Sequence, residues 1–333
     1  MSRPRASLEE LPPPPPETLS SKLTYWQYRS VWELAARLPE PLARGLPERL
    51  GSLWFRAASD RQREMVRINL GRVVGAREHD DLDELIEAAY QSYARYWFDA
   101  FRLHTMDPEE VVDRSTAENL EAIDELVADG RGAILATGHL GSWDIGAMFA
   151  TQRGWDVTVV AEVLEPRRLF EQFVWLRRKA GLGVIPLVRG GDMIERLTEV
   201  VHDGGIAALL ADRDLTKKGP VVEFFGEPCR LPPGTAALAR RTGRPVAIGA
   251  FFTEGADYRG VVTDVVDISH LSVEQGTQVV AYALERLIGR YPEQWHVFVP
   301  QWLAEREPDH PALQSSFEPP PAQLEDVRIR QDS

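Results

Sequence analysis

The stretch Arg131–Ala150, RGAILATGHLGSWDIGAMFA, predicts how the centre of the chain folds. Gly132–Thr137 is a short aliphatic run bounded by glycines, which is typical of a strand buried on both faces of a parallel sheet. Residues 138–141 predict a turn, and Ser142 is a good helix N-cap ahead of the helical composition of Trp143–Ala150. We therefore expect a strand, a turn and a helix in succession.

The predicted turn and the first turn of the predicted helix carry a histidine and an acid, His139 and Asp144. Five residues along one straight helix would point two side chains apart, but a junction between a turn and a helix can bring them together. A neutral imidazole can then take a proton from a hydroxyl, while the carboxylate orients the ring and stabilises the imidazolium. The alternative is structural: Asp144 complements the helix dipole, and His139 is an ordinary turn residue.

The composition narrows the class of protein. With 333 residues and 44% hydrophobic content, the chain is long enough for a sizeable core, and its net charge of -13 argues against a general nucleic-acid binder. The single cysteine, Cys229, excludes an internal disulfide and a cysteine-based metal cluster, which is typical of a reducing cytoplasm. The sequence contains no apolar run long enough to span a bilayer and no amino-terminal signal peptide, so we expect neither a spanning nor an exported protein.

Beyond Ala117, strands and helices are expected to alternate. The predicted strands, after the one that precedes His139, are Val157–Val163, Val184–Leu187, Ile206–Ala211, Val221–Phe225, Val246–Phe252, Gly260–Val266 and His296–Val299. The predicted helices, besides the one after the turn, are Ala117–Ala128, Pro166–Ala180, Asp192–Val201, Pro233–Thr242 and Val273–Ile288. This alternation predicts an α/β fold with a largely parallel central sheet flanked by helices. His139 would lie at the carboxyl edge of that sheet, where α/β proteins place their sites.

The amino-terminal third is expected to form a helical layer. Its predicted helices are Lys22–Leu38, a helix starting at Pro47 after a turn that ends at Gly45, Asp60–Val74 and Leu82–Leu103. Residues 1–20 include five consecutive prolines and predict a disordered tail. The domain boundaries follow: one domain over 21–302, made of the helical layer (21–115) and the α/β core (116–302), and a loosely ordered carboxyl-terminal tail over 303–333.

Tryptophans and arginines are interspersed along the first two of these helices. Trp26, Trp32, Trp54 and Phe55 suit a helical pair that lies in a membrane interface. The alternative is that these side chains pack on the core of the domain itself.

Two further segments carry candidate chemistry. Asp212, Arg213 and Asp214 follow the strand Ile206–Ala211, so they emerge at the same sheet edge as His139. An acid there can complete the charge environment of the imidazole, and Arg213 can hold carboxylates or an anionic substrate. The second segment is the basic helix 166–180, which suits a phosphorylated cofactor or an anionic lipid headgroup. A surface ion-pair cluster and a solvated helix face are the respective alternatives.

Several spaced motifs, taken together, resemble one family. GHLGSWD from Gly138, ADRDL from Ala211, VVEFFGEPCRLPPGTAALARRTGRPV from Val221 and PEQWHVFVPQW from Pro292 are similar to the bacterial lipid A biosynthesis acyltransferases. Within that family they most resemble the branch of actinobacterial phosphatidylinositol mannoside acyltransferases. NLGRVVG and SYARYWFDAFRL, at 69–75 and 92–103, extend the resemblance upstream.

The resemblance implies transfer of a fatty acyl chain from acyl-CoA, or from acyl carrier protein, to a hydroxyl of a membrane glycolipid. It places the protein as a peripheral protein on the cytoplasmic face of the cell (inner) membrane, with no permanently bound cofactor, no metal and no nucleic acid. By motif position, His139 is the general base, Asp144 its partner and Asp212 a second acid near the imidazole. The implied substrate- or cofactor-binding residues are Arg213, Asp214, Arg177, Arg178, Ser142 and Trp143, with Arg177 and Arg178 meeting the CoA phosphates. Backbone amides of residues 138–142 are expected to stabilise the oxyanion.

Other functions stay open from the sequence. A lysophospholipid or a lipid A-type acceptor is the alternative within the family, although lipid A enzymes usually carry Glu where Asp144 stands. A metal-dependent hydrolase would use His139, Asp144, Asp212 and Asp214, which are suitable ligand types. A non-catalytic scaffold that binds acyl-CoA or lipid would use the same cleft. The acceptor, the chain length and the oligomeric state are not determined by the sequence.

Overall fold

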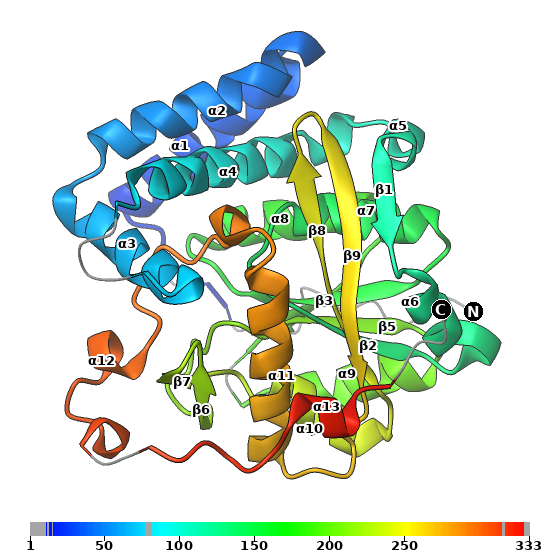
Figure 1. The fold of residues 1–333 in the computed structure, drawn as a ribbon. Helices are drawn as coiled ribbons and strands as arrows, with labels where there is room; N and C mark the ends of the chain where they lie inside the picture. The colour runs from blue at the N-terminus through cyan, green and yellow to red at the C-terminus, as the bar shows by residue number, and fades with distance from the viewer. Residues whose placement is uncertain are drawn as a thin grey trace.

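A computed structural model describes residues 11, 13–14, 16–76, 81–188, 190–314 and 317–329. The predicted α/β fold is confirmed by a seven-stranded sheet of order β1-β9-β8-β2-β5-β3-β4 (Figure 1). Its strands are β1 (Ser115–Glu118), β2 (Ala133–Thr137), β3 (Val157–Glu162), β4 (Gly183–Leu187), β5 (Ile206–Leu210), β8 (Val246–Glu254) and β9 (Asp257–Val266). Only the β8–β9 pair is antiparallel among these neighbours. The short strands β6 (Val221–Phe224) and β7 (Glu227–Arg230) form a separate hairpin.

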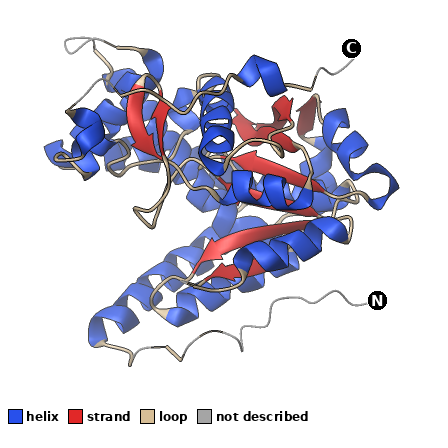
Figure 2. Ribbon diagram, turned by 90° about the horizontal axis from the view of Figure 1, so that it is seen from below, coloured by secondary structure: helices blue, strands red, loops and turns tan. Residues whose placement is uncertain are grey.

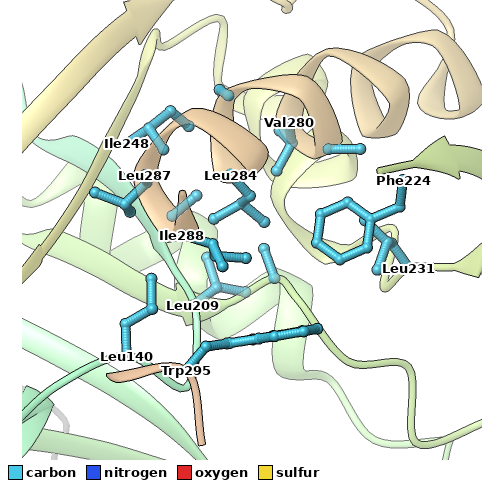
Figure 3. Packing of buried hydrophobic residues seen from close by; sticks show 14 of the residues in the cluster. Leu140, Leu209, Phe224, Leu231, Ile248, Val280, Leu284, Leu287, Ile288 and Trp295 are labelled. Atoms are coloured by element: carbon cyan, nitrogen blue, oxygen red, sulfur yellow. The ribbon is translucent and has the colours of Figure 1, made fainter. Parts of the chain in front are cut away.

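Helices cover both faces of the sheet (Figure 2). One face is covered by α9 (Met193–His202), α10 (Gly234–Thr242) and α11 (Val273–Ile288), and the other by α6 (Glu121–Val127), α7 (Trp143–Gln152) and α8 (Arg167–Lys179). The central strand β2 contributes to a hydrophobic core on each side of the sheet. Ile134 and Ala136 belong to the core under α9, α10 and α11, called the first core here, and Ala133 and Leu135 pack in the second core, under α6, α7 and α8. Successive residues of a strand point to opposite faces, so an all-apolar strand needs cover on both. Figure 3 shows the first core, in which α11 packs over the sheet.

Four helices form the predicted amino-terminal layer: α1 (Leu19–Arg37), α2 (Glu40–Ala57), α3 (Asp60–Val74) and α4 (Asp83–Arg102). Both α1 and α2 pack on α4 (Figure 1). Arg102 of α4 ties down the end of α1, since its guanidinium donates to the carbonyl oxygens of Ala35 and Leu38 at 3.1 and 2.7 Å. Among the helices of this layer, α4 makes most of the contacts with the α/β core.

The predicted break between Gly45 and Pro47 is wrong, because α2 is one helix with Pro47 in its interior. A proline there removes one backbone hydrogen bond and crowds the preceding turn. Close packing of α2 on α4 offsets this cost, since a Cβ added at Gly51 would lie 2.4 Å from the Cα of Gln91. Tertiary contact thus keeps the helix continuous where local sequence favours an end.

Local patterns also misplaced three other segments. Ala117–Ala128 is not one helix; β1 adds beside β9 first, and α6 follows. His296–Val299 is not a strand: the segment before it meets the 138–142 turn only through an isolated bridge between Trp295 and Leu140. The strand β7 was not predicted. Short extended segments such as β1 and β7 acquire their identity from a neighbouring strand that the local sequence does not reveal.

The carboxyl-terminal segment differs from the loose tail that we expected. It contains α12 (Leu303–Arg306) and α13 (Leu324–Val327), and Arg328 pairs with Val266 beyond the end of α13. Arg328 also places its Nε 2.9 Å from the buried Asp264. At the other end, residues 1–10, 12 and 15 of the predicted disordered tail lie outside the described residues, whereas Leu11 is buried against α8.

Many exposed side chains of α1 and α2 are large and apolar. The exposed large hydrophobic residues on these two helices are Leu19, Leu23, Trp26, Val31, Leu34, Leu42, Leu50, Leu53 and Trp54. Exposed polar residues, such as Lys22, Gln27, Arg49 and Arg56, are interspersed with them along the sequence. Within the described ranges, none of the helices has the length and hydropathy needed to traverse a bilayer.

Candidate active site

His139 lies at the end of β2, beside Asp212 at the end of β5. The parallel register pairs Thr137 with Leu210, and continuing both strands by two residues brings His139 opposite Asp212. The imidazole Nδ1 is 2.8 Å from Asp212 Oδ1, and the backbone amide of His139 donates to Oδ2, also at 2.8 Å. The His139 side chain is 25% exposed, whereas the Asp212 side chain is fully buried. The ring is therefore held on one side and accessible on the other.

Asp212 remains ionised although it is buried. Burial alone would raise the pKa of its carboxyl, but the nearby imidazole of His139 and the hydrogen bonds from His139 and Trp295 lower that pKa below its usual value. The Trp295 indole donates to Oδ2 at 2.8 Å, and Gln301 donates to the Asp212 carbonyl at 2.6 Å. An ionised carboxylate can only accept hydrogen bonds, so Nδ1 of His139 must be the donor. The lone pair of the neutral imidazole is then on Nε2.

The predicted contact between His139 and Asp144 is wrong. Asp144 lies in the first turn of α7, as expected, but its carboxylate accepts hydrogen bonds from Arg177 Nε at 2.8 Å and from the Tyr96 hydroxyl at 3.2 Å. Burial would lower the pKa of the Arg177 guanidinium, but the charge and hydrogen bonds of Asp144 raise it. The Asp144–Arg177 pair is thus a nearly buried ion pair between α7 and α8, while Asp212 occupies the place that we had assigned to Asp144.

The turn that carries His139 is fixed by its backbone. Gly141 adopts φ of 56°, and a Cβ there would lie 2.3 Å from the carbonyl oxygen of Phe251, so only glycine fits. The amides of residues 139, 140, 141 and 142 donate to Asp212 Oδ2, Gly138 O, Gln294 O and Phe251 O, respectively. These four donors are occupied, so they are not available to stabilise an oxyanion, whereas a role for the amide of Gly138 stays a prediction. Their work is to hold the turn against β8 and the segment 294–296.

An apolar cavity of about 130 Å³ lies between α7 and the sheet. Its walls are aliphatic and aromatic side chains from α7, β2, β3, β5, β8 and β9. The polar groups in its lining are Thr137, Asp144 and Arg177. Trp143 also lines it, with its ring centroid 5.7 Å from that of His139. Trp143 therefore belongs both to the cavity lining and to the surroundings of the imidazole, and the cavity walls suit an apolar group.

Ser142 occupies the predicted N-cap position, but its hydroxyl does not cap α7. It donates instead to Asp99 of α4 at 3.3 Å. Asp99 also accepts two hydrogen bonds from Arg95 at 3.0 Å and one from the Tyr258 hydroxyl at 3.3 Å. This buried network lies behind the turn, so Ser142 joins the catalytic segment to α4 and does not face the cavity.

The remaining predicted site residues include Trp143, Arg213 and Asp214, which lie in different surroundings. Trp143 stacks on Tyr96, with centroids 3.8 Å apart, beside His139. Arg213 is partly exposed near Tyr93, where burial raises the tyrosine pKa and the Arg213 charge opposes that rise. Asp214 is buried and accepts hydrogen bonds from Thr216 and Gly219, so it organises its own loop.

The two arginines of α8 that were predicted to bind substrate, Arg177 and Arg178, also differ in their surroundings. Arg177 is committed to Asp144 inside the protein, which corrects its predicted role toward CoA phosphates. Arg178 is partly exposed and does not line the cavity.

His296 is a residue of this site that we did not predict. Its amide donates to the His139 carbonyl at 2.8 Å, and its Nε2 lies 2.9 Å from the Ser92 hydroxyl. The ring stacks on Tyr93 and lies 6.0 Å from Trp143. It is 5% exposed, and burial, with the nearby imidazole of His139, lowers its pKa to about 3. The motif PEQWHVFVPQW was the available signal, but nothing in its local pattern places it against His139.

The donor set for a metal-dependent hydrolase does not assemble. Of the four predicted ligands, Asp144 binds Arg177 and Asp214 binds its own loop. A search of the described ranges finds no group of three or more His, Cys, Asp or Glu side chains that could hold a metal ion. Cys229 is buried, as expected of a structural thiol, and burial raises its pKa to about 12.

Comparison with known proteins identifies the family of the chain. Residues 16–304 match the bacterial lipid A biosynthesis acyltransferases. The chain belongs to this acyltransferase family. It is 37% identical over 289 residues to a phosphatidylinositol mannoside acyltransferase of Mycolicibacterium smegmatis, covering 86% of this chain and 94% of that protein. It is 36% identical over 301 residues to a phosphatidylinositol mannoside acyltransferase of Mycobacterium tuberculosis, covering 89% of this chain and 94% of that one.

The burial of His296 in this acyltransferase predicts a pH-dependent contribution to stability. Because its folded-state pKa is about 3 and the ordinary value is 6.5, the unfolded chain binds the proton first as the pH falls. The contribution is therefore present above pH 6.5 and is lost between that pH and about pH 3. We expect a loss of roughly 2 kcal/mol from this group between pH 7 and pH 5.

The measurement is urea unfolding of the wild type and His296→Gln at both pH values. Glu285 acts in the opposite direction, because burial raises its pKa to about 7 and the folded state binds that proton first. This contribution is common to both proteins and cancels in their difference. Equal pH slopes for the two proteins would show that His296 is not held neutral by the fold.

Proposed function

We propose that this acyltransferase moves a fatty acyl chain from acyl-CoA, or from acyl carrier protein, to a hydroxyl of a phosphatidylinositol mannoside. The observation that carries the proposal is the His139–Asp212 pair, whose imidazole lies beside Trp143, a residue that lines an apolar cavity. The named activity of the two mycobacterial relatives supports the acceptor class. The apolar walls of the cavity support a fatty acyl group, since they offer almost no polar partner.

His139 is the general base in this proposal and Asp212 orients it. With Nδ1–H bound to the carboxylate, Nε2 accepts the proton of the acceptor hydroxyl as that oxygen attacks the thioester carbon. The tetrahedral intermediate then collapses, the carbon–sulfur bond breaks, and the leaving thiolate takes the proton from the imidazolium. Asp212 stabilises the transient positive charge on the imidazolium and stays ionised throughout.

Asp144 acts as a positioning residue. Its carboxylate holds Arg177 at the polar part of the cavity lining and fixes the Tyr96 hydroxyl, on whose ring Trp143 stacks. Arg213, Arg178 and Trp143 remain proposed substrate-binding residues, since they lie near the site or on its flanking helix. Ser142 and Asp214 contribute through the structure of the turn and loop that they hold.

The proposed place of action is the cytoplasmic face of the cell membrane. The apolar faces of α1 and α2 suit helices that lie in the interface between lipid and water, with the protein bound peripherally. A lipid acceptor then reaches the enzyme without leaving the bilayer.

The first prediction separates the two acids. His139→Ala and Asp212→Asn should each lower kcat by about two to four orders of magnitude, because base catalysis is lost or the imidazole loses its fixed tautomer. Asp144→Asn should cost less, since the Asp144 carboxylate accepts its hydrogen bonds from Arg177 and Tyr96, whereas the imidazole is bound to Asp212. The assay is transfer of labelled palmitate from palmitoyl-CoA to the purified glycolipid, with circular dichroism to check folding.

His270→Ala is the matched control, because that histidine is exposed and distant in the sequence from every site residue. A nearly normal rate for His139→Ala would end the proposed mechanism. A severe loss of kcat in Asp144→Asn together with a mild loss in Asp212→Asn would show that Asp144, and not Asp212, is the catalytic partner of His139.

A second prediction concerns acyl-chain length. Ala147 of α7 lines the apolar cavity, and Ala147→Phe should fill part of it. We expect kcat/KM for palmitoyl-CoA to fall about tenfold or more relative to decanoyl-CoA, since a long chain loses buried contact area and meets the new ring. The decanoyl rate of the same variant is the internal control for folding. An unchanged ratio of the two substrates would place the acyl chain elsewhere.

A third prediction tests membrane association. Leu23→Asp and Leu34→Asp together should weaken binding of the full-length protein to phosphatidylinositol-containing vesicles at least tenfold, because both side chains are exposed on α1. Ile329→Asp is the control, since Ile329 is exposed in the carboxyl-terminal segment. Sedimentation with vesicles measures the bound fraction. Equal binding of the double variant and wild type would exclude the α1 face as the contact surface.

A further inference from the structure

A second cavity, of about 370 Å³, lies between α1 and α8. This volume falls within the usual range of small-molecule sites, roughly 300 to 1,000 Å³. Its lining consists of Tyr25, Arg29, Trp32, Glu33, Ala36, His104, Gln172 and Trp175. None of these residues lines the apolar cavity beside His139, so the two sites are separate.

The cavity presents aromatic faces next to groups that both donate and accept hydrogen bonds. The His104 ring lies between Trp32 and Trp175, with centroids 6.1 and 5.7 Å away. Trp32 is nearly buried and gives the wall a fixed position, whereas Trp175 is 46% exposed. Around them, the Arg29 guanidinium donates to the Tyr25 hydroxyl at 3.1 Å, and Gln172 adds an amide that can donate and accept.

The charges of the lining are balanced. Arg29 approaches Glu33 at 3.5 Å, and Glu33 is also paired with Arg37 at 2.8 Å. Burial lowers the pKa of His104, so its ring is neutral at neutral pH. A phosphate would meet the Glu33 carboxylate as well as the arginines. A neutral ring with several hydroxyls instead finds donors, acceptors and flat aromatic faces for its C–H groups.

The spacing of the lining residues along α1 places the cavity on one face of that helix. Tyr25, Arg29, Trp32 and Ala36 recur every three or four residues and form one face of α1. The exposed apolar residues Leu19, Leu23, Trp26 and Leu34 lie on a different face. If that apolar face rests on lipid, as proposed above, the cavity opens at the depth of the polar headgroups.

We propose that the cavity between α1 and α8 is a binding subsite for a neutral sugar ring of a glycolipid headgroup. That the ring belongs to a lipid rests on the proposed function, whereas the preference for a neutral sugar rests on the lining itself. The subsite holds a ring that does not react, because it shares no residue with the His139 cavity. The helix α8 connects the two, since it carries Gln172 and Trp175 for one site and Arg177 for the other.

The test is binding of methyl α-D-mannopyranoside to the full chain, followed by ligand-observed NMR. We use His139→Ala protein as the background, so that turnover plays no part. Trp175→Ala and Gln172→Ala should each weaken binding about tenfold, because they remove a stacking face and a hydrogen-bonding amide. Trp175→Phe should recover most of the affinity. Glu171→Ala is the matched control, since Glu171 is exposed on α8 and does not line the cavity.

Inorganic phosphate, tested as a competitor, should not displace the sugar. Absence of saturable sugar binding, equal affinity in Trp175→Ala and the parent, or displacement by phosphate would each overturn the proposal. Failure of the subsite proposal can be distinguished from failure of the proposed function. If only the subsite proposal is wrong, the cavity binds no sugar but the otherwise wild-type enzyme still transfers the acyl chain. In the enzyme assay, Gln172→Ala should raise KM for the glycolipid several-fold with kcat nearly unchanged, since it touches no reacting atom.

Discussion

The site depends on one buried carboxylate. An ionised acid without exposure to water is costly unless its lone pairs have donors, and the Asp212 carboxylate obtains its donors from two parts of the chain. The amide and ring of His139 come from the end of β2, and the indole of Trp295 comes from the loop after α11. Gln301 adds a bond to the Asp212 carbonyl. Because the same bonds that stabilise Asp212 also orient the imidazole, folding and catalytic geometry are coupled here.

The turn is also held by its backbone. The amides of Gly141 and Ser142 donate to neighbouring backbone carbonyls, and Gly141 allows the close approach of Phe251 that these bonds require. The helix α8 then supplies a second constraint from the other side, through the Arg177–Asp144 pair. The apolar cavity lies between α7 and the sheet, and the polar residues in its lining are Thr137, Asp144 and Arg177. Such a lining suits an apolar group with one polar end.

The sequence allowed the main elements to be predicted where the local pattern is strong. The aliphatic run before His139, the basic helix before Ala180 and the long apolar helix that ends at Ile288 all appear within a few residues of their expected bounds. The errors fall on segments whose conformation depends on a distant partner. β1 is a strand because β9 lies beside it, and α2 continues through Pro47 because Gly51 packs against α4.

The sequence by itself determined the strand, turn and helix around His139, the α/β class and the motifs that identify the family. Those features are local, or are carried by the order of residues along the chain. Only the tertiary structure decided which acid serves the imidazole. Asp144 is five positions away along the chain, but the helix turns it toward Arg177; Asp212 is 73 positions away, but the register of β2 with β5 places it at hydrogen-bonding distance. Strand adjacency in a parallel sheet is set by how helices cross between strands, which no local pattern records.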